Sequence, residues 1–169
     1  VQKLQSNNFE LAVLSRNPKK DYEFKWDIAT DFIDEKALEN VSCMIHLAGA
    51  GIADKRWTTK RKQEIIKSRV ASIQLLFTKV KEYNTPLKTF ISASGIGFYG
   101  AITSSHIFTE SNAPANDFLG NVCKFWEQAV GQFHTKKCRT VIFRTGIVLA
   151  KKGGALAKMK TPVISPIGA

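Results

Sequence analysis

Hydroxyl side chains gather after one segment of the sequence: Ser92, Ser94 and Tyr99. The run 88–94, which contains both serines, is rich in β-branched and aromatic residues and is typical of a buried strand. Parallel sheets bind ligands at the carboxyl ends of their strands, so hydroxyl groups there would face a ligand. A hydroxyl group in that position can polarise a carbonyl or exchange a proton with it. We therefore take Ser94 and Tyr99 as the candidate catalytic residues and Ser92 as a ligand-binding residue.

The same stretch contains the spacing G-x-G-x-x-G, formed by Gly95, Gly97 and Gly100. In a dinucleotide-binding turn, a helix must follow this motif at once, because the helix N-terminus holds the pyrophosphate. Residues 101–117 are instead polar, rich in turn formers and without helical period. Asp117, at the distance expected for a ribose-binding acid, opens a helix rather than closing a strand. The motif is therefore a decoy.

The elements that must position these residues alternate along the chain. Five runs are typical of strands: 10–15, 22–28, 42–48, 88–94 and 139–149. A helical pattern covers 31–40, and longer helices are predicted over 58–83 and 117–134, the last with Asn116 or Asp117 as its N-cap. Strands that alternate with long helices predict an α/β fold with a parallel sheet and helices on both faces. The expected architecture is a doubly wound, three-layer α/β/α fold of Rossmann type.

The beginning of the chain differs from such a fold. Residues 1–18 indicate the tail of a helix, a turn at "SNN" and then a strand. A Rossmann sheet has a first strand and a glycine-rich turn before that helix. We therefore expect the sequence to lack this first strand and turn.

Two strand ends carry side chains suited to an adenosine group. Ser15 and Arg16 close the strand 10–15, where an acidic residue would suit a free 2′-hydroxyl and an arginine favours a 2′-phosphate. Asp27 closes the strand 22–28, and its carboxylate could accept from an adenine amine. The alternatives are a solvated surface turn for Arg16 and a turn or N-cap role for Asp27.

A third strand end consists of small residues, which let a ligand approach the backbone closely. They follow the buried run 42–48 and are Ala48, Gly49, Ala50 and Gly51. The ligand here would be the pyrophosphate and ribose of a dinucleotide. His46, inside the run, is interpreted as a core histidine with its hydrogen bonds satisfied.

Bulk properties limit the function classes. With 169 residues, 44% of them hydrophobic, the chain suits a single domain, and no apolar run approaches the ~20 residues that span a bilayer. No signal-peptide layout is present, so we expect a cytoplasmic protein that does not bind membranes. The three cysteines include no C-x-x-C pair and therefore predict neither disulfides nor a zinc site, so we expect no bound metal. The net charge of +11 is spread along the chain without a nucleic-acid-binding module, which favours one phosphate site over nucleic acid.

Four segments together resemble a known family: "MIHLAGAGIADKRWTTKRKQEIIKSRVASIQLL", "FISASGIGFYG", "DFLGNVCKFWE" and "FRTGIVLAKKGGALAKM". They are similar to the atypical branch of the extended short-chain dehydrogenase/reductase superfamily, whose members are described as NAD-dependent epimerase/dehydratase or sugar-nucleotide epimerase family proteins. The resemblance covers residues 1–160 and implies one NAD(P)-binding Rossmann domain over 1–169. It also implies a glycine-rich turn before Val1 and a substrate-binding part after Ala169.

The resemblance implies a role for several positions. Arg16 corresponds to the residue beside the adenosine ribose, Asp27 and Ile28 to the adenine contact, and Leu47–Gly49 to the segment along the ribose and phosphates. Arg69 stands where typical members carry a cofactor-side asparagine. The matching positions nearer the nicotinamide are Ser92 and Ser94 on the hydroxyl-bearing strand and Thr145, Gly146 and Val148 on the loop that closes over the ligands.

One departure concerns catalysis. Typical members use Tyr-x-x-x-Lys, in which the lysine lowers the pKa of the tyrosine and binds the nicotinamide ribose. None of the three tyrosines has a lysine four residues later, and the expected helix offers Leu119 and Cys123 at the matching positions. Neither Ser94 nor Tyr99 has an evident activator in the sequence.

Three functions follow as hypotheses. The first is an oxidoreductase or epimerase that uses NADP, or alternatively NAD, and acts on a small-molecule substrate resembling a sugar nucleotide. Its anion could be held by Lys55, Arg56 and Arg69. The charges expected to be merely solvated are Lys60, Arg61 and Lys62. The second is a non-catalytic NADP(H)-binding or redox-sensing protein. The third, nucleic-acid binding through net charge, is disfavoured. The resemblance also implies that helices 58–83 and 117–134 can pair in a homodimer.

Overall fold

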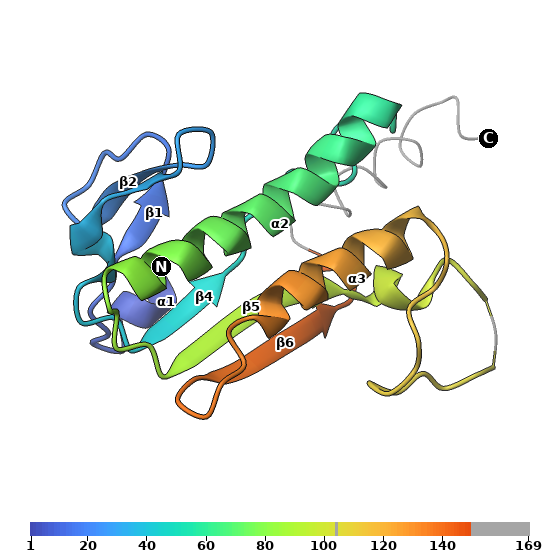
Figure 1. The fold of residues 1–169 in the computed structure, drawn as a ribbon. Coiled ribbons are helices and arrows are strands. Elements are labelled where there is room, and N and C mark those ends of the chain that lie inside the picture. The colour runs from blue at the N-terminus through green and yellow to red at the C-terminus, as the bar shows by residue number, and fades with distance from the viewer. Residues whose placement is uncertain (104, 150–169) are drawn as a thin grey trace.

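A computed structural model describes residues 1–103 and 105–149 of the chain, and its ribbon is drawn in Figure 1. The short helix α1 (Gln2–Gln5) opens it and leads through a turn into the first strand. Asn8 takes a positive φ of 59° in that turn, a conformation that asparagine adopts more readily than most residues. This agrees with the predicted helix tail and turn. The part of the predicted domain beyond residue 149 lies outside the described residues.

A small sheet carries the first strands. It has the order β1 (Val13–Ser15), β2 (Glu23–Asp27), β3 (Phe32–Ile33). β1 and β2 are parallel, as expected, and β3 returns antiparallel to β2.

The second sheet holds the predicted hydroxyl-bearing strand at its centre. Its order is β4 (Cys43–His46), β5 (Thr89–Gly95), β6 (Arg139–Thr145), and all pairs are parallel. Parallel neighbours need crossover connections, and the two long helices supply them. Because the strands run in one direction, their carboxyl ends lie at one edge of the sheet, where the candidate residues were expected (Figure 1).

The crossover helices are α2 (Thr59–Glu82) and α3 (Phe118–Gly131), within one to three residues of the predicted bounds. The Thr58 hydroxyl, at the predicted start of the first helix, accepts from the amide of Arg61. The carboxylate of Asp117, one of the two predicted N-caps of the second helix, accepts from the amide of Gly120 at 2.7 Å. Both helices pack on each other over the same face of β4–β6 (Figure 1).

Replacing Asp117 by alanine should lower the free energy of unfolding by about 1 kcal/mol, because it leaves orphan amides at the start of α3 without an acceptor. Urea unfolding followed by circular dichroism measures the change. Asp117→Asn, which keeps an acceptor oxygen, should lose much less. If both variants lost the same free energy of unfolding, the cap hydrogen bond would not be the cause of the loss.

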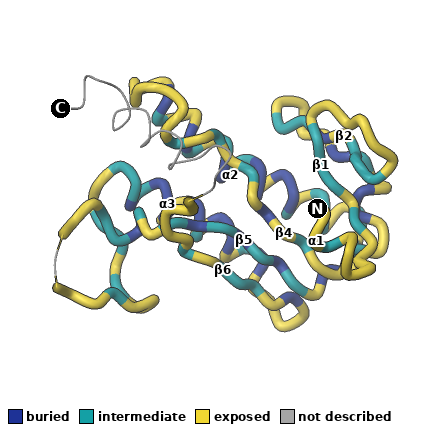
Figure 2. The backbone as a smooth tube through the Cα atoms, turned by 180° about the vertical axis from the view of Figure 1, so that it is seen from behind, coloured by how far each residue is buried: buried dark blue, intermediate teal, exposed yellow. Residues whose placement is uncertain are grey.

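The core lies between these helices and the sheet. Phe90 of β5 is fully buried and stacks on Phe133 with ring centroids 3.9 Å apart, and Phe77 meets Phe133 edge to face at 5.2 Å. Trp126 is also buried. In Figure 2 the buried residues of α2 and α3 are coloured dark blue, whereas the described part of 101–116 is mostly exposed.

The helical prediction for 31–40 is wrong. This segment forms β3, which pairs with β2, and a single 3-10 turn, η1 (Glu35–Leu38), in which the amide of Lys36 donates to the Asp34 carboxylate. A second 3-10 turn, η2 (Ile96–Tyr99), follows β5 directly. No α-helix therefore begins directly after the glycine spacing, since the next one in the described chain, α3, starts at Phe118, which agrees with the interpretation of that motif as a decoy.

Long helices on both faces of the sheet were expected, but α2 and α3 share one face. On the other face of β4–β6, Ile45 and Phe143 are about half exposed. Among the described residues, no helix combines the length and apolar character needed to cross a bilayer.

Candidate functional site

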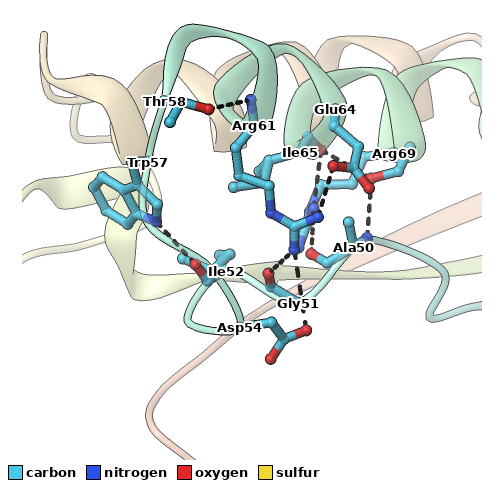
Figure 3. Close-up of polar contacts among 11 residues, drawn as sticks. Ala50, Gly51, Ile52, Asp54, Trp57, Thr58, Arg61, Glu64, Ile65 and Arg69 are labelled. Carbon is cyan, nitrogen blue, oxygen red and sulfur yellow. Dashed lines mark hydrogen bonds and ion pairs between the residues drawn. The ribbon is translucent and has the colours of Figure 1, made fainter.

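The loop after β4 is fixed to helix α2 by three side chains. Figure 3 shows the contacts of two of them, Arg61 and Arg69, with this loop. The Ala50 amide donates to the Ser68 hydroxyl at 2.9 Å, and the Ala50 carbonyl accepts from Arg69 Nη1 at 3.1 Å. The Gly51 carbonyl accepts from Arg61 Nη2 at 2.6 Å. The conformation of the small-residue loop is therefore set by helix α2.

Arg69 is 6% exposed, and its guanidinium lies 4.9 Å from the ring centroid of Trp126. Burial lowers the pKa of this guanidinium, but arginine stays charged at any working pH. Gly49 has to be small here, because a Cβ would lie 2.9 Å from Cζ of Arg69. The arginine predicted to bind the cofactor thus supports the loop at Gly49 and Ala50 from beneath.

The expectation that Arg61 is a solvated charge is wrong. Arg61 is 7% exposed; besides Gly51 it contacts the Glu64 carboxylate at 2.7 Å and that of Asp54 at 4.0 Å. Lys60, beside it, is exposed as expected, and Lys62 is partly buried. Of the three predicted anion-holding residues, Arg69 is buried, whereas Lys55 and Arg56 are exposed on the loop.

His46 is buried at the end of β4, as predicted, but the prediction that its hydrogen bonds are satisfied is wrong for Nδ1, which has no partner among the described residues. Its Nε2 lies 2.8 Å from the Ser72 hydroxyl, which itself donates to the Arg69 carbonyl. Because the Ser72 hydroxyl already donates its proton to that carbonyl, it can only accept from His46 Nε2. His46 is therefore the neutral tautomer with its proton on Nε2. Burial, with a smaller effect of Arg69, lowers the pKa of His46 to about 4.

Ser94 faces helix α3, 4% exposed, and its hydroxyl donates to Glu127 Oε1 at 2.7 Å. Glu127 also accepts from Arg144 twice, from Nε at 2.9 Å and from Nη2 at 2.8 Å. This bidentate ion pair is mostly buried, and it raises the pKa of Arg144. One of the two candidate catalytic hydroxyls is thus tied to an ion pair between α3 and β6.

The second candidate hydroxyl joins the same ion pair. Tyr99 Oη accepts from Arg144 Nη1 at 2.8 Å and donates to the Thr109 carbonyl at 3.1 Å. The guanidinium also stacks 3.5 Å from the ring centroid of Phe98 and donates to the Glu110 carbonyl. Arg144 therefore connects Tyr99, the end of β5 and the segment after η2.

Glu127 and Arg144 are the site residues that sequence reasoning missed. They stand 17 positions apart, and nothing local marks either one. Ser94 and Arg144 occupy paired positions of β5 and β6, a register that only the sheet reveals.

The positions of the missing acid/base pair hold packing residues. Leu119 lies against Gly97, where an added Cβ would be 3.2 Å from the leucine Cβ. Burial raises the pKa of the Cys123 thiol, whose Sγ lies 3.6 Å from the Gly95 carbonyl. Neither residue offers a titrating group near neutral pH.

The other nicotinamide-side residues surround the end of β5. Ser92 is fully buried, and its hydroxyl donates to the Ala93 carbonyl, so it is directed into the protein. Thr145 is exposed and donates to the Ser94 carbonyl at 2.9 Å. Gly146 is exposed, with nothing near the position of a Cβ. The structure thus brings Ser94, Tyr99 and Thr145 together.

The adenosine-side residues form a separate group at the ends of β1 and β2. Ser15 accepts from the Asn17 amide, Asp27 accepts from the Ala29 amide, and Ile28 packs against the core. Arg16 is exposed, and its carbonyl accepts from Lys25. The hydrogen bonds of Ser15 and Asp27 are local, whereas that of the Arg16 carbonyl joins the ends of β1 and β2.

Several features of the loop after β4 fit a dinucleotide. Leu47 is 73% exposed and Gly49 is exposed, so a ligand can reach the loop backbone, while Ala48 is partly buried. Beneath the loop, Nε of Arg69 and Nδ1 of His46 are buried without a hydrogen-bond partner. Within residues 1–103 and 105–149 no three His, Cys, Asp or Glu side chains are grouped as metal ligands would be.

Comparisons with known proteins bear on this geometry. An epimerase family protein from Staphylococcus aureus is 33% identical over 174 aligned positions, covering 99% of this chain and 57% of that protein. One from Mycobacterium leprae is 29% identical over 164 positions, covering 97% of this chain and 52% of that protein. The family resemblance is confirmed. The chain is similar to these epimerase family proteins over almost its whole length.

Solved structures confirm the Rossmann-like α/β fold of this chain. The human epimerase family protein SDR39U1 (isoform 2), determined with NADPH, has a TM-score of 0.80 at 26% identity and covers 95% of this chain and 53% of that one. A nucleoside-diphosphate sugar epimerase from Corynebacterium glutamicum has a TM-score of 0.78 at 32% identity. The match covers 95% of this chain and 33% of that one. No family model matches the sequence. The chain spans about half the length of the curated relatives it matches.

Proposed function

We propose that this protein binds NADP(H) and acts as an oxidoreductase or epimerase on a small, sugar-nucleotide-like substrate. The observation that carries the proposal is its likeness to the human relative determined with NADPH, which extends over 95% of the chain. The nucleoside-diphosphate sugar epimerase at 32% identity supports the substrate class. When bound, the nicotinamide would supply hydride transfer. The part of the protein described here would provide most of the cofactor site.

In this proposal the loop after β4 lies along the ribose and phosphates of the cofactor. The backbone of Leu47, Ala48 and Gly49 would make the close approach, and Ala50 anchors the loop to α2. Arg69 would act from beneath, since its Nη1 is held by carbonyl groups. Its buried charge adds a positive potential at the place where phosphates would bind.

The other cofactor contacts follow from the strand ends. Arg16, exposed after β1, would bind the 2′-phosphate, with Ser15 beside it. Asp27 and Ile28 would contact the adenine. Three residues around the end of β5 would lie on the nicotinamide side: Ser92, Thr145 and Gly146.

The proton chemistry would rest on Ser94 and Tyr99. The Ser94 hydroxyl now donates to Glu127, and the Tyr99 hydroxyl donates to the Thr109 carbonyl. Either group must therefore exchange its present acceptor for the substrate before it can donate a proton. Arg144, already bonded to Tyr99 Oη, could offset negative charge that develops there.

The same hydrogen bonds favour a second candidate, a non-catalytic NADP(H)-binding or redox-sensing protein. Both hydroxyls are committed within the protein, and Leu119 and Cys123 replace the usual acid/base pair. Under either function we propose a cytoplasmic protein, with α2 and α3 as the surface of a homodimer.

Titration of the protein in its full natural length with NADPH and NADH, followed by dihydronicotinamide fluorescence, tests the cofactor assignment. We expect tighter binding of NADPH, and Arg16→Ala should weaken NADPH about tenfold because a charge-assisted contact is lost. NADH affinity should stay unchanged, and Lys19→Ala should change neither. Equal weakening of both nucleotides by Arg16→Ala would contradict the role of Arg16. Absence of binding by either nucleotide would sink the cofactor proposal itself.

A further inference from the structure

A groove of about 700 Å³ opens at the amino ends of β5 and β6. Its walls come from the last turns of α2, the segment 85–88 and the chain after α3. The candidate functional site lies at the carboxyl ends of the same strands, so the groove is at the opposite end of the sheet (Figure 1). It plays no part in the function proposed above.

The floor of the groove is apolar. Phe77, Val80, Leu87, Phe133 and Cys138 form it, and the rings of Phe77 and Phe133 meet edge to face. Phe133 and Leu87 belong to the buried core, so the floor is an opening in the packed interior, which gives it a fixed shape. The volume lies in the range of small-molecule pockets, which are mostly apolar with a few polar groups at their edges.

The rim of the groove is positive. Lys81, Lys88 and Lys137 line it, and none of the lining residues is acidic. Lys81 Nζ lies 4.1 Å from the ring centroid of Phe77, which places one ammonium group directly above the floor. The nearby Glu82 carboxylate is paired with Lys79 at 2.8 Å. An apolar ligand with an anionic end would meet complementary surfaces in both places.

We propose that this groove binds a small amphiphile that has one unbranched apolar chain and one anionic head group, of the fatty carboxylate class. The chain lies on the floor beside Phe77 and Val80, which are partly exposed. Removal of their apolar surface and that of the ligand chain from water drives binding. The carboxylate pairs with Lys88 and Lys137 at the rim. Lysine suits this role, because its long stem can follow the head group while the ammonium stays hydrated.

Isothermal titration of the protein with dodecanoate, below the concentration at which it forms micelles, tests the proposal. We expect saturable binding of one dodecanoate. Dodecyltrimethylammonium, with the same chain and the opposite charge, should bind at least tenfold more weakly, because like charges would meet at the rim. Equal binding of the two probes would overturn the proposal, since apolar contact alone would then explain it.

Two variants locate the site. Val80→Trp should abolish dodecanoate binding by filling the groove, and Lys88→Glu combined with Lys137→Glu should weaken it about tenfold. Lys67→Glu combined with Lys124→Glu makes the same charge change at exposed helix positions away from the groove and should leave binding unchanged. Circular dichroism checks that each variant is folded. Equal weakening by both double variants, or unchanged binding by Val80→Trp, would overturn the assignment.

Anionic lipid vesicles separate the free amphiphile from a membrane surface. Binding to vesicles without binding of monomeric dodecanoate would overturn the proposal, because it would reveal a charged surface and not a groove. Loss of dodecanoate binding in Val80→Trp with unchanged NADPH binding is the expected pattern. It would also show that this site and the proposed cofactor site are independent.

Discussion

Replacing Glu127 by glutamine is expected to lower the free energy of unfolding by about 3 kcal/mol. The Glu127 and Arg144 side chains are only 13% and 17% exposed, and their two parallel hydrogen bonds form the charged centre of the candidate site. The substitution preserves shape and an acceptor oxygen for Ser94, but it leaves the guanidinium without a counter-charge. A cation that is mostly removed from water and has no counter-charge destabilises the folded state. The loss of stability in Glu127→Gln should therefore be larger than that of ordinary surface substitutions.

The chain provides a matched control for this substitution. Glu82 is paired with Lys79 at the same distance, 2.8 Å, but Glu82 is 49% exposed. Glu82→Gln should therefore change the free energy of unfolding far less than Glu127→Gln does. Urea unfolding of both variants by circular dichroism gives the comparison. A loss in Glu127→Gln no larger than that in Glu82→Gln would contradict the structural importance of the pair.

Replacing both partners tests the origin of the loss. If the unpaired charge is its cause, Glu127→Leu combined with Arg144→Met should be more stable than Glu127→Gln alone. This double variant also removes the contact between Arg144 and Tyr99. Its NADPH affinity should stay close to that of the natural protein if the pair only positions the hydroxyl groups.

The local sequence was sufficient to predict the long helices and most strands. The apolar stripe of α2, with members such as Ile65 and Ile73, has helical period, and Thr58 and Asp117 supply caps at the starts of the two helices. Caps and periodicity are short-range features, so a single sequence contains them. The helical prediction for 31–40 was wrong because β3 depends on pairing with β2, a contact that the apolar spacing of the segment does not show.

The candidate site was predicted less well, because its polar contacts join distant parts of the chain. Ser94 and Tyr99 were found from their place after a strand, but the partners that occupy their hydroxyl groups were not. For Arg61 a signal existed: with Ile65, Arg69 and Ile73 it forms a series at four-residue spacing, so it belongs to the buried stripe of α2. The adjacent charges of Lys60 and Lys62 led instead to the prediction that Arg61 is solvated.

The protein should lose stability as the pH falls from about 6.5 to about 4, because His46 is buried as the neutral imidazole. The unfolded chain binds a proton on this histidine near pH 6.5, whereas the folded chain does so only near pH 4. The unfolded state therefore holds more protons in this window, and the stabilisation present above pH 6.5 disappears on acidification. The loss attributable to His46 is roughly 3 kcal/mol once the pH is below both values.

The surroundings of His46 explain this shift and define the control. Within residues 1–103 and 105–149, the charge that acts on His46 is that of Arg69, whose cation disfavours a second positive charge. Its ring and hydroxyl contacts are with Ser72, Phe90 and Trp126. His46→Gln retains a donor for Ser72 and removes the titration, so its unfolding free energy should fall less between pH 7 and pH 5 than that of the natural protein. Urea unfolding at these pH values, with an NMR titration of the His46 ring, measures both quantities. Parallel losses in the two proteins, or an imidazole that titrates near pH 6.5, would show that His46 is not held neutral by burial.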